Sequence, residues 1–180
     1  MLSTIKVIFL VFFDVCRFKR RPQDIPQSVN LMSLCLFVYL LVATLLLVLT
    51  ETPGRSFLSA CVEIVILLLF TIGLLMLSGK ANRWVQTITA MSGTGVVLSL
   101  IALPVYILMG MYTTADANTN PLYTIAVMVL AALALWNIAV MAHILREALE
   151  VGMFTGVMLA ISYIWIILSV SAAMFPTEYS

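Results

Sequence analysis

The sequence predicts an all-α fold, a polytopic membrane bundle of about five transmembrane helices with an interfacial amphipathic helix in front of them. Of the 180 residues, 63% are hydrophobic and only 9% are charged. A water-soluble domain of this size could not bury so much apolar surface in one core, so lipid must be its solvent. The apolar residues also fall into long runs separated by short polar segments, which is typical of a multi-pass membrane protein.

Residues 1–30 are predicted to form a cytoplasmic interfacial helix and a proline-containing linker. The apolar run in IKVIFLVFFDVCRF is too short to cross a bilayer, and a cleavable signal peptide is not predicted because the basic cluster follows the run. Pro22 and Pro26 stop the helix and predict an extended connection to the first span. Four basic residues either contact lipid headgroups or a partner, or serve to fix the topology: Arg17, Lys19, Arg20 and Arg21.

The transmembrane domain is assigned to residues 31–175, followed by a short external tail at 176–180. A hydrocarbon core of roughly 30 Å needs about 20 helical residues, and five stretches are long enough. The predicted spans are 31–49, 57–78, 84–112, 122–145 and 153–175. Because the links between them are short, consecutive helices are expected to be antiparallel neighbours.

The distribution of Lys and Arg predicts how the bundle is oriented. Eight of these residues lie on one side of the predicted topology and only Arg55 lies on the other. Basic loops resist translocation, so the N-terminus is expected in the cytoplasm. With an odd number of spans, the C-terminus is expected outside.

Polar side chains inside the spans are the first candidates for function, because a charge in hydrocarbon costs on the order of several kcal/mol unless it is paired. Glu63 lies about two turns from the outer end of the second span. It is either a protonatable or cation-binding group facing the bundle, or a side chain that snorkels to the outer interface or forms a hydrogen bond with a neighbouring helix. In the fourth span, Asn137 is a candidate for an interhelical hydrogen bond and His143 for pH sensing, with interface anchoring as the alternative. The face at positions 136, 140, 143 and 147 gathers much of this polarity.

Small residues predict where helices approach closely. Gly152, Gly156 and Ala160 recur every four residues at the start of the fifth span and predict a helix-packing surface. In the third span, Pro104 predicts a kink, and the SGTG string at 92–95 predicts close contact or local unwinding. A broken helix can form a transporter site, but the two similar halves usual in such transporters are not found in this sequence.

Enzyme chemistry is not predicted. The sequence has no P-loop, no GxSxG, no HExxH and no carboxylate pair with catalytic spacing. One histidine and three dispersed cysteines indicate neither a metal site nor a disulfide framework, so no cofactor is expected. The net charge of +1 argues against nucleic acid. The expected partners are the lipid bilayer and other membrane proteins or copies of the chain itself.

Two strings resemble a known family: RPQDIP at 21–26 and WNIAVMAHILREAL in the fourth span. They are similar to uncharacterised proteobacterial Yip-like membrane proteins, which look distantly related to the five-span Ypt-interacting-protein superfamily. The resemblance implies a multi-pass protein of the bacterial inner membrane with a cytoplasmic N-terminus and a periplasmic C-terminus. It also implies a non-enzymatic organiser that binds other proteins in the bilayer.

Three hypotheses for function follow from the sequence. The first is a scaffold, adaptor or accessory subunit of a membrane assembly, and the alternative is a small oligomeric transporter or channel that uses Glu63 and the His143 region. A third is a membrane-shaping or lipid-binding protein that inserts residues 1–21 as an amphipathic wedge. Five spans enclose little room for a solute path unless several copies assemble, which ranks the scaffold first.

Overall fold

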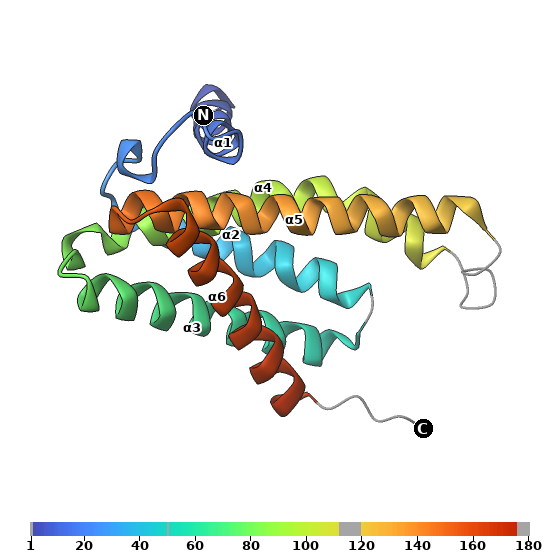
Figure 1. Ribbon diagram of the computed structural model, residues 1–180. Helices are drawn as coiled ribbons and strands as arrows, with labels where there is room; N and C mark the ends of the chain where they lie inside the picture. The colour runs from blue at the N-terminus through green and yellow to red at the C-terminus, as the bar shows by residue number, and fades with distance from the viewer. Residues whose placement is uncertain (1, 50, 112–119, 176–180) are drawn as a thin grey trace.

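The computed structural model describes residues 2–49, 51–111 and 120–175, and all regular structure within these ranges is helical. The elements in chain order are α1 (Leu2–Cys16), the 3-10 helix η1 (Pro22–Asp24), α2 (Val29–Val48), α3 (Pro53–Leu77), the 3-10 helix η2 (Ala81–Arg83), α4 (Trp84–Gly110), α5 (Pro121–Leu149) and α6 (Met153–Met174) (Figure 1). Within the described part of the chain, the five helices α2 to α6 are long and apolar enough to cross a membrane. The predicted fold class, an all-α polytopic membrane bundle, is confirmed. The tail at 176–180 lies outside the described residues.

Three helices are longer than the sequence predicts, and local chemistry explains each difference. Helix α2 starts before residue 31 because the Ser28 hydroxyl accepts a hydrogen bond from the Leu31 N–H at 3.3 Å. Helix α3 starts at Pro53 instead of residue 57, since a proline ring already holds the φ that a first helical turn requires. Helix α5 continues past residue 145 to Leu149 and ends where Glu150 adopts a left-handed conformation with φ of 55°.

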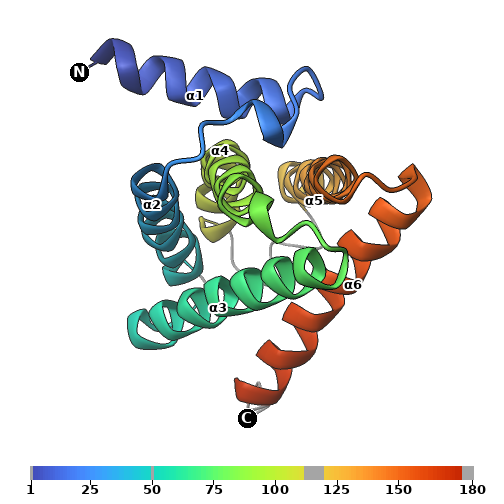
Figure 2. The same ribbon diagram turned by 90° about the vertical axis from the view of Figure 1, so that its left-hand side faces the viewer.

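Helix α4 lies at the centre of the bundle. It packs most extensively on α2 and α5 and also contacts α1 and α3. Figure 2 shows α2, α4 and α5 close to end-on, with α1 crossing on one side of them and α3 and α6 crossing obliquely on the other. A short link joins α3 to α4, but these two helices share much less contact than α2 and α4 do. Two helices that follow each other in the chain therefore do not always share the most extensive contact in the bundle.

One stretch of α4 is buried on every side, since residues 87–94 are all buried. Its hydroxyl groups each donate a hydrogen bond to the carbonyl four residues earlier, at 2.6–2.9 Å, and these residues are Thr87, Thr89, Ser92 and Thr94. No hydroxyl of this set is left unpaired in apolar surroundings. The helix runs without interruption through Gly93, Gly95 and Pro104, so the unwinding predicted as one possibility is absent.

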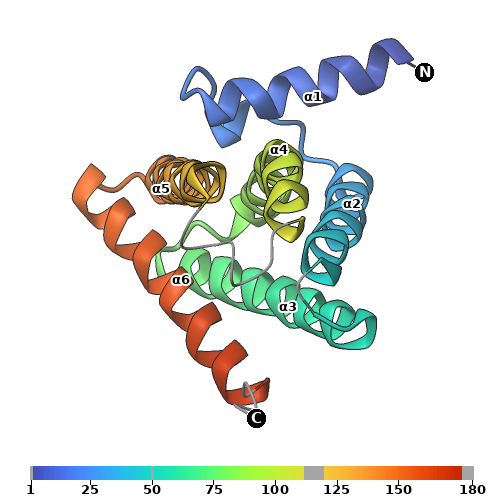
Figure 3. The ribbon, with the colours of Figure 1, turned by 90° about the vertical axis from the view of Figure 1, so that its right-hand side faces the viewer.

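Helix α1 crosses the bundle and packs on α4, as the views from the two ends show (Figures 2 and 3). A β-carbon at position 93 would lie 2.3 Å from Cε1 of Phe12, so Gly93 permits this crossing. Phe12, Val15 and Cys16 are buried, whereas Phe9 is 44% exposed. The apolar face predicted to enter the membrane surface is therefore turned in part onto the protein.

The loops that carry most of the Lys and Arg residues meet at one end of the bundle, termed the basic end. Lys80 and Arg83 both pair with Glu150, and the Arg83 Nη2 to Glu150 Oε1 distance is 2.7 Å. Arg21 pairs with Glu147, with Nε and Oε2 3.4 Å apart. These ion pairs join the N-terminal linker and η2 to the end of α5. The grouping of basic loops used to predict the orientation is thus present in the fold.

Candidate functional site

Two adjoining cavities open inside the bundle. The larger, of about 310 Å³, lies between α2, α3, α4, α5 and α6, and the smaller, of about 210 Å³, continues along α2, α4 and α5 toward the end opposite the basic end. Because both cavities are lined by Tyr39, Gly95, Ala134 and Asn137, they form one space, termed the crevice. The polar residues of its lining are Tyr39, Glu63, Thr94, Ser99, Tyr106, Asn137 and Tyr163.

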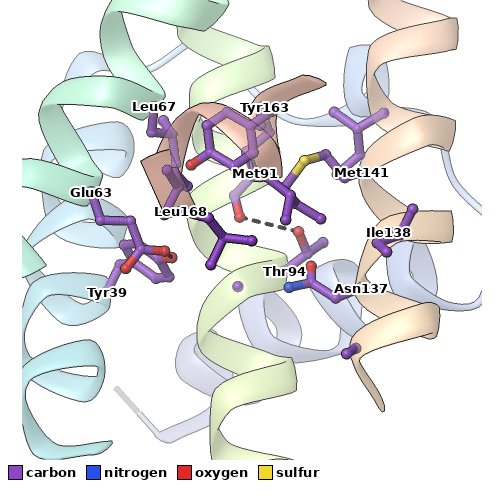
Figure 4. Close-up of a pocket in the computed structure, with 15 residues that line it drawn as sticks. Tyr39, Glu63, Leu67, Met91, Thr94, Asn137, Ile138, Met141, Tyr163 and Leu168 are labelled. Atoms are coloured by element: carbon purple, nitrogen blue, oxygen red, sulfur yellow. Dashed lines mark hydrogen bonds between the residues drawn. The ribbon is translucent and has the colours of Figure 1, made fainter. Parts of the chain in front are cut away.

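Glu63 brings a carboxyl group to the crevice. The Tyr39 hydroxyl donates a hydrogen bond to Glu63 Oε1 at 2.5 Å, which joins α2 to α3. Figure 4 shows the two side chains together on one side of the larger cavity. Since α3 begins at Pro53, Glu63 lies about 15 Å along the helix, deeper than the two turns that the sequence predicts. The carboxyl group lies inside the bundle, so the snorkelling conformation is not adopted, and the alternative hydrogen bond to a neighbouring helix is the one made with Tyr39.

Gly95 sets the position of Tyr39. A β-carbon on this glycine would lie 2.6 Å from Cε2 of the tyrosine ring, a separation that real β-carbons do not reach. The ring therefore passes across the α4 backbone only because residue 95 has no side chain. The predicted close contact at this glycine is thus between α4 and a side chain of α2.

Tyr163 on α6 and Thr94 on α4 contribute two further hydroxyl groups. Tyr163 is buried, and its ring packs on Phe70 with the ring centres 5.2 Å apart. Thr94 donates to the carbonyls of Ala90 and Met91 at 2.8 and 3.2 Å, so its hydroxyl oxygen keeps only acceptor capacity for a ligand (Figure 4). The crevice therefore presents oxygen atoms from several helices.

Asn137 lines both cavities and is exposed, although it lies near the middle of α5. No other described residue forms a hydrogen bond with its side chain. Its amide is directed into the larger cavity in Figure 4. The interhelical hydrogen bond predicted for this residue is not made with any residue that the structure describes, so the amide is available to a ligand or a partner.

His143 does not belong to the crevice. Its Nε2 lies 3.4 Å from the Arg20 carbonyl oxygen, and its ring meets the edge of Phe18 at 5.3 Å between ring centres. On the same face of α5, the Trp136 indole N–H donates to the Cys16 carbonyl at 2.9 Å. The polar face predicted at positions 136, 140, 143 and 147 therefore holds the N-terminal segment against α5. Asn137 lines the crevice, whereas His143 contacts the N-terminal segment.

The four basic residues predicted to reach headgroups or a partner are all exposed, but two of them have acidic neighbours. Arg20 pairs with Asp14, with Nε and Oδ2 3.4 Å apart, and Arg21 pairs with Glu147. Arg17 places its guanidinium 5.7 Å from the ring centre of Phe13. Arg17 and Lys19 form no ion pair with any described residue, so their charges face outward.

The small-residue stripe packs over part of its length. Gly156 and Ala160 are buried, and a β-carbon on Gly156 would lie 2.7 Å from the Ala142 carbonyl oxygen. These two residues let α6 approach α5 closely. Gly152 differs from the prediction, because it precedes the first turn of α6 and a β-carbon there would meet no atom within 4 Å.

Tyr39 and Tyr163 are the site residues that the sequence analysis missed. Their signal was available, since tyrosine in a membrane protein is enriched at the interfaces and both of these lie well inside predicted spans. In the described part of the chain, no three His, Cys, Asp or Glu side chains come together in a metal-binding arrangement. The crevice is lined by oxygen atoms and aromatic rings.

The sequence matches no family model, no curated protein and no solved structure. The similarity to Yip-like proteins therefore stays a prediction.

Proposed function

We propose that the chain is a small, non-enzymatic transporter that binds its solute in the crevice beside Glu63. The observation that carries this proposal is the Glu63–Tyr39 pair in the wall of a cavity of about 310 Å³. A carboxyl group within a membrane bundle is costly and marks a functional site by default. Five spans enclose little room for a solute path, so the working form is an oligomer.

The shape of the crevice supports the same proposal. Its smaller cavity extends from the shared residues Tyr39 and Asn137 to Leu46 and Tyr106, which lie toward the end opposite the basic end. Helix α6 diverges from α5 along its length (Figures 2 and 3). Ala134, which lines the larger cavity, is exposed. A solute therefore has room to approach from one membrane face or from the bilayer.

The proposed location is the bacterial inner membrane, with the basic end in the cytoplasm. The support for this orientation is the positive-inside rule applied to the loops that meet at the basic end. The crevice then extends toward the periplasm.

Solute uptake into proteoliposomes tests the transport proposal. A panel of labelled amines, amino acids, sugars and organic acids is offered with and without an imposed pH gradient. At least one class is expected to enter faster than into protein-free liposomes, and Glu63→Gln should abolish this uptake because it replaces the ionisable carboxyl group by an amide. Glu150→Gln is the matched control, since Glu150 lies at the basic end and should be dispensable. A panel in which nothing enters faster would contradict the proposal.

A second candidate function is the scaffold or adaptor, and one specific observation favours it. Arg17 and Lys19 follow α1, a helix held on α4 and α5, and their charges face outward without an ion pair to any described residue. Such a fixed basic platform suits an acidic segment of another membrane protein or anionic headgroups.

Crosslinking in native membranes followed by mass measurement tests the adaptor. A crosslinked complex is expected for the wild type and should be lost in Arg17→Ser/Lys19→Ser. The same complex should persist in Lys80→Ser, since Lys80 is already paired with Glu150. A protein that stays free of partners in every form would count against the adaptor.

A further inference from the structure

The lining of the crevice has one carboxyl group and no basic side chain. Among the described residues that line the two cavities there is no Lys, Arg or His. An anion in this space would meet a carboxyl group with no counter-charge. A cation would instead meet the oxygen atoms of Glu63, Tyr39 and Tyr163.

The lining also has the polarisable groups that favour an organic cation. Tyr39 and Tyr163 place aromatic rings in the larger cavity, and Met141 adds a thioether sulfur. The sulfur of Met91, another lining residue, instead accepts a hydrogen bond from the buried Thr71 hydroxyl at 3.4 Å. Ring faces attract alkylammonium groups, and the attraction is stronger where water is excluded. The Tyr163 ring is held in place by Phe70, so this part of the lining is preformed.

The remaining walls favour a ligand with an apolar body. Most of the other lining residues are aliphatic, as at Leu67, Ile138 and Ile164. The larger cavity lies at the lower end of the range of about 300–1,000 Å³ that is usual for small-molecule sites. A divalent metal ion fits poorly, because calcium needs about six to eight oxygen ligands and the lining offers a single carboxyl group.

We infer that the ligand of the crevice is a monovalent organic cation with an apolar body, whose charged group lies at Glu63 between the rings of Tyr39 and Tyr163. This inference rests on the proposed function, since it names the class of solute that the same site takes. The partner charge for Glu63 then comes from the ligand, because the described lining does not supply it.

Equilibrium binding of labelled phenyltrimethylammonium to the full chain in nanodiscs tests the inference. The wild type is expected to show saturable binding above that of empty nanodiscs. The neutral isostere tert-butylbenzene has carbon in place of the charged nitrogen. It should compete at least about tenfold more weakly than unlabelled phenyltrimethylammonium, because it lacks the charge that contacts Glu63 and the rings. This comparison uses the wild-type protein alone, so it does not depend on how a variant folds.

A variant pair assigns the charge contact. Glu63→Gln should weaken binding by about tenfold or more, while Glu150→Gln should leave the affinity unchanged. Equal competition by the neutral isostere, unchanged affinity in Glu63→Gln, or no saturable binding to the wild type would each overturn the inference. Binding without uptake would support the organic-cation inference and contradict the transport proposal. Uptake of only neutral or anionic solutes would support the transport proposal and contradict the organic-cation inference.

Discussion

The absence of a side chain at Gly95 shapes the crevice. The ring of Tyr39 crosses the α4 backbone at this residue, and its hydroxyl group then reaches Glu63 on α3. The hydrogen bond between Tyr39 and Glu63 depends on the positions of α2, α3 and α4 together. A local shift of one helix therefore cannot restore it once it is lost. The same logic applies to Gly93 under Phe12 and to Gly156 under Ala142.

Gly95→Ala should destabilise the protein by about 1–3 kcal/mol, because the new β-carbon forces the tyrosine ring out of its position. Thermal unfolding in detergent measures the effect. Gly73→Ala is the matched control, because a β-carbon at position 73 meets no atom within 4 Å. The control should be neutral or stabilising by up to about 1 kcal/mol, as expected for alanine in a helix. Equal effects of the two substitutions would contradict the described packing.

Glu150 gives a prediction for the pH dependence of stability. Hydrogen bonds from Lys80 and Arg83 hold the pKa of this carboxyl group below its usual value of 4.5. Its contribution to stability is therefore present above pH 4.5 and is lost as the pH falls through the lowered pKa. The unfolding midpoint of the wild type should exceed that of Glu150→Gln near neutral pH, and the two should converge as the pH falls below 4.5 and through the lowered pKa of Glu150. A constant difference across this range would argue against the ion pairs.

At the scale of elements, the sequence predicted the helices well and their partners less well. Long apolar runs between short polar links are enough to locate α2 to α6. A single segment that crosses hydrocarbon must satisfy its backbone hydrogen bonds internally, which a helix does. Which helices touch depends on residues far apart in the chain, such as Tyr39 and Glu63 or Gly93 and Phe12. The hydrophobic periodicity of a single span does not predict such a pair. The same limit explains why Asn137 and His143 were grouped although they serve different sites.

Docking of α1 on α4 is predicted to depend on Gly93. Gly93→Ala should displace the Phe12 ring and loosen α1, because the new β-carbon would lie 2.3 Å from that ring. Hydrogen exchange measured by mass spectrometry should then rise in residues 8–16 and change little in α3. The same profile for Gly93→Ala and the wild type would show that α1 is not held at this contact.

At the scale of the whole molecule, the two ends of the bundle differ in charge. Ion pairs at the basic end join the N-terminal linker, η2 and α5, while Arg55 at the other end pairs with Glu51 and donates to the Phe175 carbonyl. This asymmetry supports one orientation, with the crevice between the two ends and its smaller cavity directed away from the basic end.

Reporter fusions test the proposed orientation. Green fluorescent protein fused after residue 180 should stay dark and alkaline phosphatase fused there should be active, because the proposed C-terminus is periplasmic. Fusions in the loop between α3 and α4 should give the opposite result. A fluorescent C-terminal fusion would reverse the orientation and with it the side toward which the crevice extends.

Glu63 lies inside the bundle in contact with Tyr39, and a double-mutant cycle on the unfolding free energy tests this contact most directly. Tyr39→Phe should cost about 0.5–1.5 kcal/mol in the wild-type background, because it removes the hydroxyl that bonds the carboxyl group. In the Glu63→Leu background the same substitution should cost almost nothing, giving a coupling of at least about 0.5 kcal/mol. Additive effects of the two substitutions would contradict the contact and the site built on it.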